Sequence, residues 1–490
     1  MARKEKYLID HNGVDKREIG YYSTHEFVAE FITQKMLEIK RNGTRVLDPC
    51  VGKEELLKFF LDTGIECSGI DVFRHKKSYE SNFYQKDFIN FYSNRKKKAF
   101  FNNFEVLEYD YYIANPPYNC HEIDYIKNNK DHLKKIFNPI GVHNMYSMFI
   151  SAIIDFAKND SVIGLITYDS FLTSKAHEKL RKKILNNCTI HYLALCPTDL
   201  FLQQGADVRT CILILQKGKD HQGLIKTSNR PLDTSEFKTI IKNNEFEEFE
   251  ESELVLDSKF DNGEIVVGLP DEIRKLFRNE RLGDKFRCIT GISTGNDSKY
   301  LSEEQSDLFK YPFYKNPGSR KFYTEPDAYL TSDFLELDKS VKNFMVRNKK
   351  LLFREGITCS SMGVEFSACY LPPNSTFGVN ANIICSQNDL WWLLSYLNSS
   401  LVTYLVRGIL NRSNMVTSGY VSRIPIPKFN EDTKEKLSEC AKRGYLASRK
   451  NKQLENITSQ IDQVIFNDFN VKYETREEIK AFNNNVIKLT

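Results

Sequence analysis

Short apolar runs alternate with longer amphipathic segments between residues 44 and about 216. The short runs predict seven strands: TRVLDP, ECSGIDV, FYQKDF, YDYYIANPP, SVIGLITY, IHYLALCP and RTCILILQK. In EELLKFFLDTG and MYSMFISAIIDFAKND, apolar residues recur three and four positions apart, as they do in helices. This alternation predicts an α/β domain with a mostly parallel, doubly wound sheet. The last two strands are joined by a loop too short for a helical crossover, so we expect an antiparallel hairpin at the sheet edge.

The pattern changes after residue 217, which predicts further parts of the molecule. A chain of 490 residues is too long for one ordinary core. Residues 226–275 are polar and acidic and are expected to form a connector after a first domain, residues 1–225. Residues 276–430 are irregular, with many aromatic residues and turn signals such as GISTGNDS and LPPNSTFG. Residues 431–490 have a charged, helical pattern and are expected to form a helical tail.

Composition limits the class of protein. With 41% hydrophobic and 12% aromatic residues, the chain is expected to be folded and soluble. No apolar run reaches membrane-spanning length, and MARKEKYLIDHNG has no apolar signal region, so we expect a cytoplasmic protein without a membrane partner. The 11 cysteines are scattered, with no C-x-x-C pair, which favours reduced thiols over disulfides and predicts no metal site.

Charge is unevenly distributed, although the net charge is only +4. RHKK (74–77), NRKKK (94–98) and EKLRKKIL (178–185) are basic clusters. Clusters of this kind are more often solvated faces than nucleic-acid contacts. They permit a polyanionic partner without requiring one.

The predicted strands end in residues suited to a nucleoside site. In open α/β sheets, ligands bind outside the carboxyl ends of the strands. An acidic residue at the end of the second strand is placed to accept hydrogen bonds from ribose hydroxyls. A single aspartate at such a position more often caps a helix or a turn, but four strand ends in register favour a nucleoside site. These ends are Asp48-Pro49, Asp71-Val72, Asp87-Phe88 and Asn115-Pro116-Pro117-Tyr118.

The fourth of these ends, NPPY, is chemically unusual. Neither proline has an N–H to donate, and each pushes the preceding residue out of helical geometry. The Asn115 side chain and nearby carbonyls are therefore expected to be held rigidly at the tip of a strand, beside the aromatic face of Tyr118.

The order of motifs resembles a known family. "YYSTHEFVAEFI", "VLDPCVG", "SGIDV", "KDF" and "NPPY" follow one another as in the gamma class of amino-methyltransferases of bacterial restriction–modification systems. "DLFLQQGADVRTCILILQK" resembles the loop and hairpin that close over the target base in that class, and "GISTGNDSKYL" the start of the recognition domain. The resemblance covers nearly the whole chain.

The resemblance implies a fold and a reaction. It implies a Rossmann-like methyltransferase domain (a mixed seven-stranded sheet ending in an antiparallel hairpin), then an α+β target-recognition domain over residues 276–430 and the helical tail. The reaction would be methyl transfer from S-adenosylmethionine to the N6 amine of an adenine flipped out of double-stranded DNA, in the cytoplasm of a bacterium or phage host. A separate cognate restriction endonuclease is left open.

The resemblance also implies roles for individual residues. Asn115 and the Pro116 carbonyl would accept the two amine hydrogens, which localises the nitrogen lone pair. Tyr118 and Phe201 would stack on the two faces of the base. Asp71 would bind the ribose hydroxyls, Asp87 the adenine amine of the cofactor, and Phe88 its ring. The catalytic residues would be Asn115, Pro116, Pro117 and Tyr118, and the cofactor-binding residues Thr24, Asp48, Pro49, Cys50, Asp71, Val72, Asp87, Phe88 and Asn115.

One departure from the family pattern keeps alternatives open. The glycine loop commonly reads D-P-x-x-G-x-G, but this chain has DPCVGKE, with Glu54 where the second glycine is usual. S-adenosylmethionine has no phosphate for such a loop to bind, so this glycine is less obligatory. Glu54 would support the alternative of a DNA-binding subunit with a decayed methyltransferase domain, whereas the intact Asn115, Pro116, Pro117 and Tyr118 argue against it. NPPY also occurs in enzymes that methylate RNA or protein amides, but the long region after residue 276 favours duplex DNA.

Overall fold

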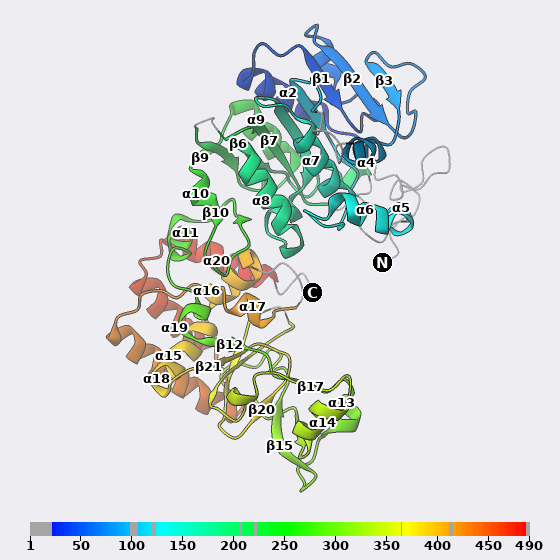
Figure 1. The fold of residues 1–490 in the computed structure, drawn as a ribbon. Helices are drawn as coiled ribbons and strands as arrows, with labels where there is room; N and C mark the ends of the chain where they lie inside the picture. Colours follow the sequence, from blue (N-terminus) through cyan, green and yellow to red (C-terminus); the bar gives the residue numbers. More distant parts are fainter. Residues whose placement is uncertain are drawn as a thin grey trace. The chain divides into compact units, whose positions relative to one another are not determined.

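The computed structural model describes residues 22–98, 106–118, 124–204, 208–219, 223–363, 365–410 and 415–486. The chain divides into two compact units (Figure 1). Unit 1 comprises Met1–Asp257 and Asn262–Gly268, and unit 2 comprises Ser258–Asp261 and Leu269–Thr490.

Unit 1 is built on one nine-stranded sheet in the order β3-β2-β1-β4-β5-β7-β6-β8-β9. The first five strands in this order are parallel, and β7 is antiparallel to both of its neighbours. All seven predicted strands are present, which confirms the α/β class. The strands are β1 (Arg45–Asp48), β2 (Glu66–Asp71), β3 (Asn82–Gln85), β4 (Tyr111–Ala114), β5 (Val162–Tyr168), β6 (Cys188–Leu195), β7 (Thr210–Lys217), β8 (Ile225–Ser228) and β9 (Glu247–Phe249).

The predicted antiparallel hairpin is confirmed, but its position at the sheet edge is wrong. Strand β8 pairs in parallel with β6, and β9 pairs antiparallel with β8. The segment expected to be a connector therefore extends the sheet, with helix α9 (Thr234–Asn243) between the two added strands. Strand β9 could not be predicted from its sequence, because it is an edge strand with no buried residue. An edge strand of this kind needs no apolar residues.

Helices cover both faces of the sheet, and the strand residues alternate between them. On β4, Tyr112 faces one apolar core and Tyr111 the other. One face is covered by α2 (Glu26–Ile39), α3 (Lys58–Leu61) and α9, and the other by α4 (Phe88–Lys98), α6 (Lys130–Phe137), α7 (Met145–Phe156) and α8 (Glu178–Asn187). The shorter elements are α5 (Asp124–Asn128), α10 (Glu251–Leu254), the pair β10 (Val255–Leu256) and β11 (Glu264–Ile265), and the 3₁₀ turns η2 (Asp169–Leu172), η3 (Lys175–His177) and η4 (Leu202–Gln204).

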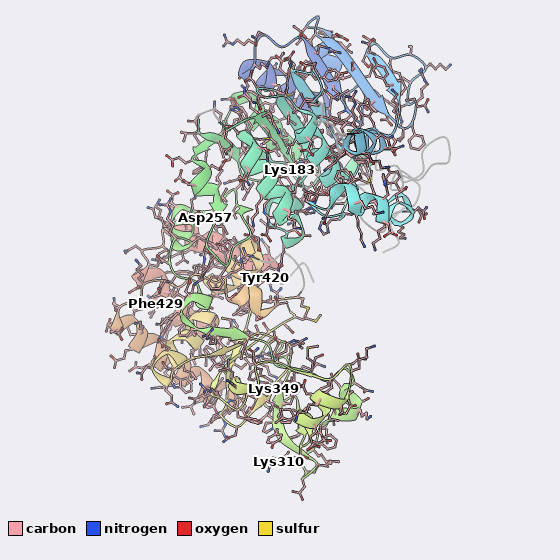
Figure 2. The ribbon with its side chains drawn as sticks, viewed as in Figure 1. Lys183, Asp257, Lys310, Lys349, Tyr420 and Phe429 are labelled. Atoms are coloured by element: carbon pink, nitrogen blue, oxygen red, sulfur yellow. The ribbon has the colours of Figure 1, made fainter. Side chains whose placement is uncertain are left out.

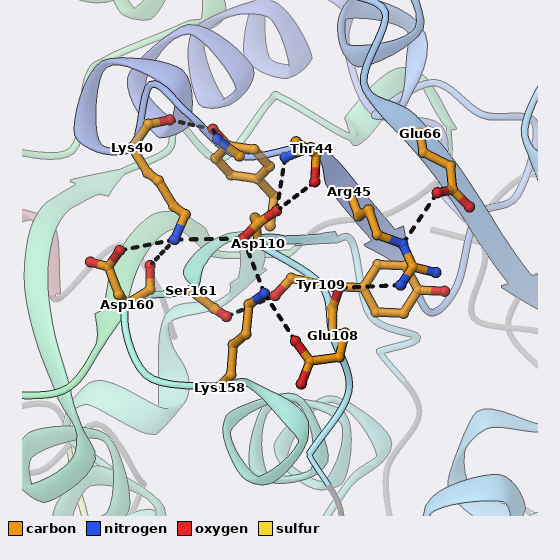
Figure 3. A network of polar contacts seen from close by, with 12 residues as sticks. Lys40, Thr44, Arg45, Glu66, Glu108, Tyr109, Asp110, Lys158, Asp160 and Ser161 are labelled. Carbon is orange, nitrogen blue, oxygen red and sulfur yellow. Dashed lines mark hydrogen bonds and ion pairs between the residues drawn. The ribbon is translucent and has the colours of Figure 1, made fainter.

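A polar network ties together the amino ends of the central strands (Figure 3). Asp110, just before β4, accepts a hydrogen bond from the Thr44 N–H at 2.8 Å. Its other oxygen lies 3.3 Å from the Lys158 amine and 3.6 Å from that of Lys40, which also pairs with Asp160 at 2.9 Å. These contacts lie at the amino ends of the strands, and NPPY lies at the carboxyl end of β4. They stabilise the pairing of β1 with β4.

Unit 2 begins as an α+β structure of short strands. One sheet has the order β12-β21-β18-β19 and another the order β14-β16-β15-β20, and β13 pairs with β17. The second sheet packs on an aromatic core that includes Phe313, Phe334 and Phe377. The strands are β12 (Arg287–Ile289), β13 (Ile292–Ser293), β14 (Leu301–Ser302), β15 (Phe309–Tyr314), β16 (Ala328–Thr331), β17 (Met345–Val346), β18 (Gly356–Cys359), β19 (Ala368–Leu371), β20 (Thr376–Phe377) and β21 (Asn382–Ile384), with α11 (Asp271–Leu276), α12 (Leu282–Lys285), α13 (Asp297–Tyr300), α14 (Phe334–Ser340) and η5 (Lys349–Leu351).

The remainder of unit 2 is helical, as predicted for the tail, but the helices start before residue 431. Helix α15 packs against α18, where the Ser395 hydroxyl donates to the Leu437 carbonyl at 2.6 Å. The run WWLLSYL is buried almost all round and so lacks the polar face that marks a surface helix. The helices are α15 (Gln387–Leu397), α16 (Ser400–Thr403), the π-helix η6 (Tyr404–Leu410), α17 (Ser418–Val421), α18 (Glu431–Arg449), α19 (Glu455–Asp468) and α20 (Tyr473–Val486).

Within the described ranges no single helix has the length and apolar composition of a membrane span. Only the pair Gln387–Leu397 and Ser400–Leu410 meets that test together, and it is bent by 70°.

Candidate active site

The candidate site lies where the chain order of the sheet reverses. From β1 the chain proceeds outward to β2 and β3, and it then returns to β4 on the other side of β1. The carboxyl ends of β1 and β4 therefore flank the position at which open α/β sheets bind ligands. Asp48 ends β1, and Asn115 follows β4 directly. The structure thus brings together two of the predicted strand ends that are far apart in sequence.

The loop after β1 is bonded to the tip of β4. Asp48 is buried, and its Oδ1 accepts the Cys50 N–H at 2.9 Å. The Asn115 backbone N–H donates to the Cys50 sulfur. Burial raises the pKa of Asp48 well above its ordinary value, and the nearby Asp71 charge raises it further. Burial raises the pKa of the Cys50 thiol in the same way, as do the charges of Asp48 and Asp71.

The Asn115 side chain is held in one orientation. Its Nδ2 donates to the Tyr22 carbonyl at 2.9 Å and to the Thr24 hydroxyl at 3.0 Å. A backbone carbonyl can only accept, so the amide nitrogen must face Tyr22, and Oδ1 faces the other way. The Asn115 oxygen is therefore an acceptor held in a fixed position, because the hydrogens of the amide nitrogen are already bonded to Tyr22 and Thr24. Thr24 holds the Asn115 side chain, and its predicted contact with the cofactor stays a prediction.

Aromatic rings gather beside this amide. Tyr118 is buried, donates its hydroxyl to the Ile166 carbonyl at 3.2 Å and stacks on Tyr168 with centroids 4.4 Å apart. Tyr22 is nearly parallel to Tyr118 at 6.0 Å. The sequence analysis did not predict Tyr22 or Tyr168. Tyr168 is the last residue of β5, next to the end of β4, so the rule that ligands bind at strand ends would have found it.

Phe201 lies beside Tyr118, and the expectation that the two rings stack on opposite faces of one base stays a prediction. Their centroids are 6.4 Å apart, the planes are inclined by 69°, and Phe201 is fully buried. A planar base between two parallel rings needs about 7 Å, twice the usual carbon–carbon contact distance. Phe201 must therefore shift if both rings are to stack on one base.

The end of β2 offers a carboxylate beside exposed apolar side chains. Asp71 accepts the Gly52 N–H at 2.9 Å on one oxygen and the Phe73 N–H at 3.0 Å on the other. Oδ1 also lies 3.6 Å from the His75 Nε2, so Oδ2 is the oxygen that keeps a lone pair for a further donor. Val72 and Phe73 are both 48% exposed, so they offer apolar surface next to this carboxylate. Val72 was predicted from the sequence, whereas Phe73 was missed.

Asp87 and Phe88 have structural roles at the start of α4. Asp87 accepts the Asn90 N–H at 3.0 Å, which caps the helix, and the Tyr125 hydroxyl at 2.7 Å. Burial and the Asp87 charge raise the pKa of Tyr125 above its ordinary value. The Phe88 ring is 2% exposed and packs on Phe149 at 5.1 Å. The helix-cap interpretation therefore applies to Asp87.

Glu54 has a role that explains its place in the glycine loop. Its φ is 69°, in the left-handed region that normally favours glycine. The carboxylate is buried, pairs with the Lys76 amine at 2.6 Å and accepts the Ser81 N–H at 2.8 Å. Burial raises its pKa, but these partners outweigh burial and the net pKa is lowered. Glu54 thus anchors the segment that follows β2.

Basic side chains of the 178–185 cluster and of unit 2 are bonded within the protein. In the 178–185 cluster on α8, Lys183 (Figure 2) pairs with Asp155 at 2.7 Å, and Arg181 donates to carbonyls that include Phe171. In unit 2, Lys321 pairs with Glu365 at 3.1 Å. Lys310 on β15 is exposed, and Lys349 at η5 is exposed but pairs with Asp338 (Figure 2).

Within the described ranges, no group of three or more His, Cys, Asp or Glu side chains is arranged to hold a metal ion.

The doubly wound sheet and the NPPY tip at its switch point are those of an amino-methyltransferase by class. The model of one family, N-6 DNA Methylase, matches residues 5–261. The chain belongs to this family, which confirms the resemblance seen in the sequence.

Individual relatives agree with this assignment. The Type II methyltransferase M.BstVI of Geobacillus stearothermophilus is 23% identical over 218 residues. The match covers 41% of this chain and 38% of that relative, so the chain spans well under half the length of the curated protein that it matches.

Two solved structures share the fold. The Type IIL restriction–modification enzyme MmeI in complex with DNA has a TM-score of 0.52 at 10% identity, over 98% of this chain and 80% of that chain. A nuclease-deletion mutant of the Type ISP restriction–modification enzyme LlaGI, with a DNA substrate mimic, has a TM-score of 0.51 at 13% identity, over 87% of this chain and 55% of that chain.

Proposed function

We propose that the protein is a site-specific DNA methyltransferase that transfers a methyl group from S-adenosylmethionine to the N6 amine of an adenine flipped out of duplex DNA, in a restriction–modification, defence or epigenetic role. The observation that carries the proposal is the Asn115 amide, whose two donors are used by Tyr22 and Thr24 and whose oxygen is held outward. Membership of the N-6 DNA methylase family supports the same reaction.

The arrangement suits an amine that is a poor nucleophile. The N6 lone pair of adenine is delocalised into the ring, so the nitrogen must become more tetrahedral before it reacts. Asn115 Oδ1 and the Pro116 carbonyl accept its two hydrogens and favour that geometry, and no strong base is required. When bound, S-adenosylmethionine supplies a methyl group on a positively charged sulfur, which makes that carbon an electrophile.

The residues at the ends of β1 and β2 fit this cofactor. Asp71 keeps a lone pair on Oδ2 for a ribose hydroxyl, and the exposed Val72 and Phe73 offer an apolar surface for adenine. Asp48 and the loop through Cys50 lie next to Asn115, on the side where the methionine part would meet the reacting amine. Asp87 keeps a lone pair on each oxygen and remains a candidate for the cofactor amine.

The target base would stack on Tyr118, with Tyr168 supporting that ring from behind. Base–aromatic stacking contributes roughly 1–3 kcal/mol, which offsets much of the unpairing cost. Residues 276–430 would read the DNA sequence, supported by their aromatic loops and exposed lysines such as Lys310. A separate restriction endonuclease remains a proposed partner of the complete system.

The alternative of a decayed methyltransferase domain rested on Glu54. Its carboxylate is bonded to Lys76 and Ser81, and Asp48, Asp71 and Asn115 keep the bonds that shape the site. This arrangement favours an active enzyme over a DNA-binding subunit. RNA and protein-amide substrates remain outcomes of the test.

Incubation with S-adenosylmethionine and unmethylated genomic DNA tests the proposal directly. Nucleoside mass spectrometry should detect N6-methyladenine, and single-molecule sequencing should place it in one sequence motif. The Asn115→Ala variant serves as the control for contaminating activity. Cofactor binding without methylation of DNA would support the RNA or protein alternative, and absence of cofactor binding would support the decayed subunit.

A further inference from the structure

A four-residue segment, Tyr22–His25, links three loops of the candidate site, and it does so through partners about 30 to 180 residues away. Tyr22 and Thr24 hold the Asn115 amide. The Ser23 hydroxyl donates to Glu55 in the loop after β1 at 2.9 Å. The third connection is made to the loop that carries Phe201.

That third connection is a reciprocal pair of hydrogen bonds. The Ser23 N–H donates to Gln204 Oε1 at 2.8 Å, and Gln204 Nε2 donates to the Ser23 carbonyl at 2.7 Å. One side-chain amide thus satisfies both backbone groups of Ser23, as a neighbouring strand would. His25 Nε2 lies 2.6 Å from the Leu200 carbonyl, so the loop is tied on both sides of Phe201.

We propose that Gln204 is a positioning residue for catalysis: by holding Ser23, it fixes Tyr22 and Thr24 and thereby the orientation of the Asn115 amide. This inference rests on the proposed function. Gln204 is not expected to touch either the base or the cofactor. Gln204 affects the reaction only through Ser23 and Asn115. A shift of the loop that carries Phe201 would therefore also change the orientation of the Asn115 amide.

The chain offers a matched control for this proposal. Gln203 lies beside Gln204 in the same short helix, is exposed, and has no hydrogen bond to any residue that the structure describes. Gln204→Met keeps the length of the side chain but removes both hydrogen bonds to Ser23, whereas Gln203→Met makes the same chemical change without that loss. Gln204→Glu keeps an acceptor for the Ser23 N–H and loses the donor.

Single-turnover methyl transfer to unmethylated genomic DNA, at saturating S-adenosylmethionine, measures the effect on the chemical step. Displacement of a reacting group by about 1 Å can cost on the order of 100-fold in rate, so we expect a loss of about 10- to 100-fold for Gln204→Met. Gln204→Glu should fall between Gln204→Met and the wild type, and Gln203→Met should stay within about twofold of the wild type.

The decisive comparison is made in an Asn115→Ala background. If Gln204 acts by orienting the Asn115 amide, Gln204→Met should cause no further loss of rate once that amide is absent. An equal loss in both backgrounds would show that Gln204 acts independently of Asn115 and would overturn the proposal.

Amide hydrogen exchange tests the hydrogen bonds between Gln204 and Ser23 without the need for methyl transfer. Gln204→Met should speed exchange in peptides spanning residues 22–25 by about tenfold or more, and Gln203→Met should leave it unchanged. Equal exchange in both variants would overturn the inference even if the enzyme is active. A wild type that transfers no methyl group but shows the expected difference in exchange would contradict the proposed function alone.

Discussion

At the scale of single residues, Asn115 is expected to matter for the rate of methyl transfer and much less for binding. Asn115→Ala removes the oxygen that faces away from Tyr22, and loss of one preorganised group typically lowers kcat by about 10²–10³-fold. Asn115→Asp keeps an acceptor but cannot donate to the Tyr22 carbonyl, so its rate should lie between alanine and wild type. Single-turnover rates and S-adenosylhomocysteine affinity measure the two effects. A near wild-type rate in Asn115→Ala would make the amide a structural group.

Asp71 is expected to contribute to cofactor affinity. Asp71→Ala removes a carboxylate that holds the Gly52 and Phe73 N–H groups and that would accept ribose hydroxyls. Lost hydrogen bonds to a charged group should weaken binding of S-adenosylhomocysteine by ~1.5–3 kcal/mol, measured by calorimetry. The affinity of Asp87→Ala provides a comparison, because the Asp87 carboxylate also caps helix α4. Unchanged affinity in a folded Asp71→Ala protein would remove the assignment.

Glu54 has a left-handed backbone conformation and a buried carboxylate that bonds to Lys76 and Ser81. Substitutions separate the effects of these two features on stability. Glu54→Ala loses the bonds to Lys76 and Ser81 but keeps the left-handed backbone, whereas Glu54→Gly loses the bonds and relieves the strain. Glycine should therefore be more stable than alanine by about 1 kcal/mol in urea unfolding. Both should be less stable than wild type, because the Ser81 N–H is left unsatisfied. Equal stability of the two variants would show that the backbone is unstrained.

At the scale of elements, the network between β1 and β4 should depend on pH. Burial raises the pKa of Asp110, but the Thr44 N–H and Lys158 outweigh this, and the net pKa lies below its ordinary value of 3.8. Its contribution to the free energy of unfolding is therefore fully present above pH 4 and is lost as pH falls through the lowered pKa. Asp110→Asn should cost about 1–2 kcal/mol at pH 7 in urea unfolding, and the difference from wild type should shrink below pH 4. A difference that stayed constant to pH 3 would assign the effect to packing.

The elements that the sequence predicted well are those whose burial follows a simple period. Strands β1, β2 and β4 to β7 are buried along most of their length, because helices cover both faces of the sheet, whereas edge strand β3 has no buried residue. Edge strand β9 has no buried residue, so its polar sequence resembled a connector. Helix α15 was concealed for the opposite reason, since most of its surface is apolar and buried.

At the scale of the whole molecule, one buried ion cluster should control the stability of unit 2. Asp261 is fully buried and accepts hydrogen bonds from Arg281 at 2.9 Å and Arg423 at 3.2 Å. Asp261→Asn removes the charge that both guanidinium groups share and should cost ~3–5 kcal/mol in urea unfolding. Asp432→Asn breaks an exposed pair with Lys436 and should change stability by less than about 0.5 kcal/mol. Similar losses in the two variants would contradict a special role for the cluster.

The sequence by itself determined the class of the sheet, the strand ends and the NPPY tip, because hydrophobic period and proline geometry are local properties of the chain. Only the tertiary structure decided that Asp87 caps a helix, that Glu54 faces Lys76, and that Tyr22–Thr24 orient Asn115. The Asp87 cap is a contact with Asn90 on the next turn, but the Glu54 and Asn115 contacts join residues 22 and 91 to 93 positions apart. Such contacts arise from the packing of whole elements, and no local pattern in the chain records them.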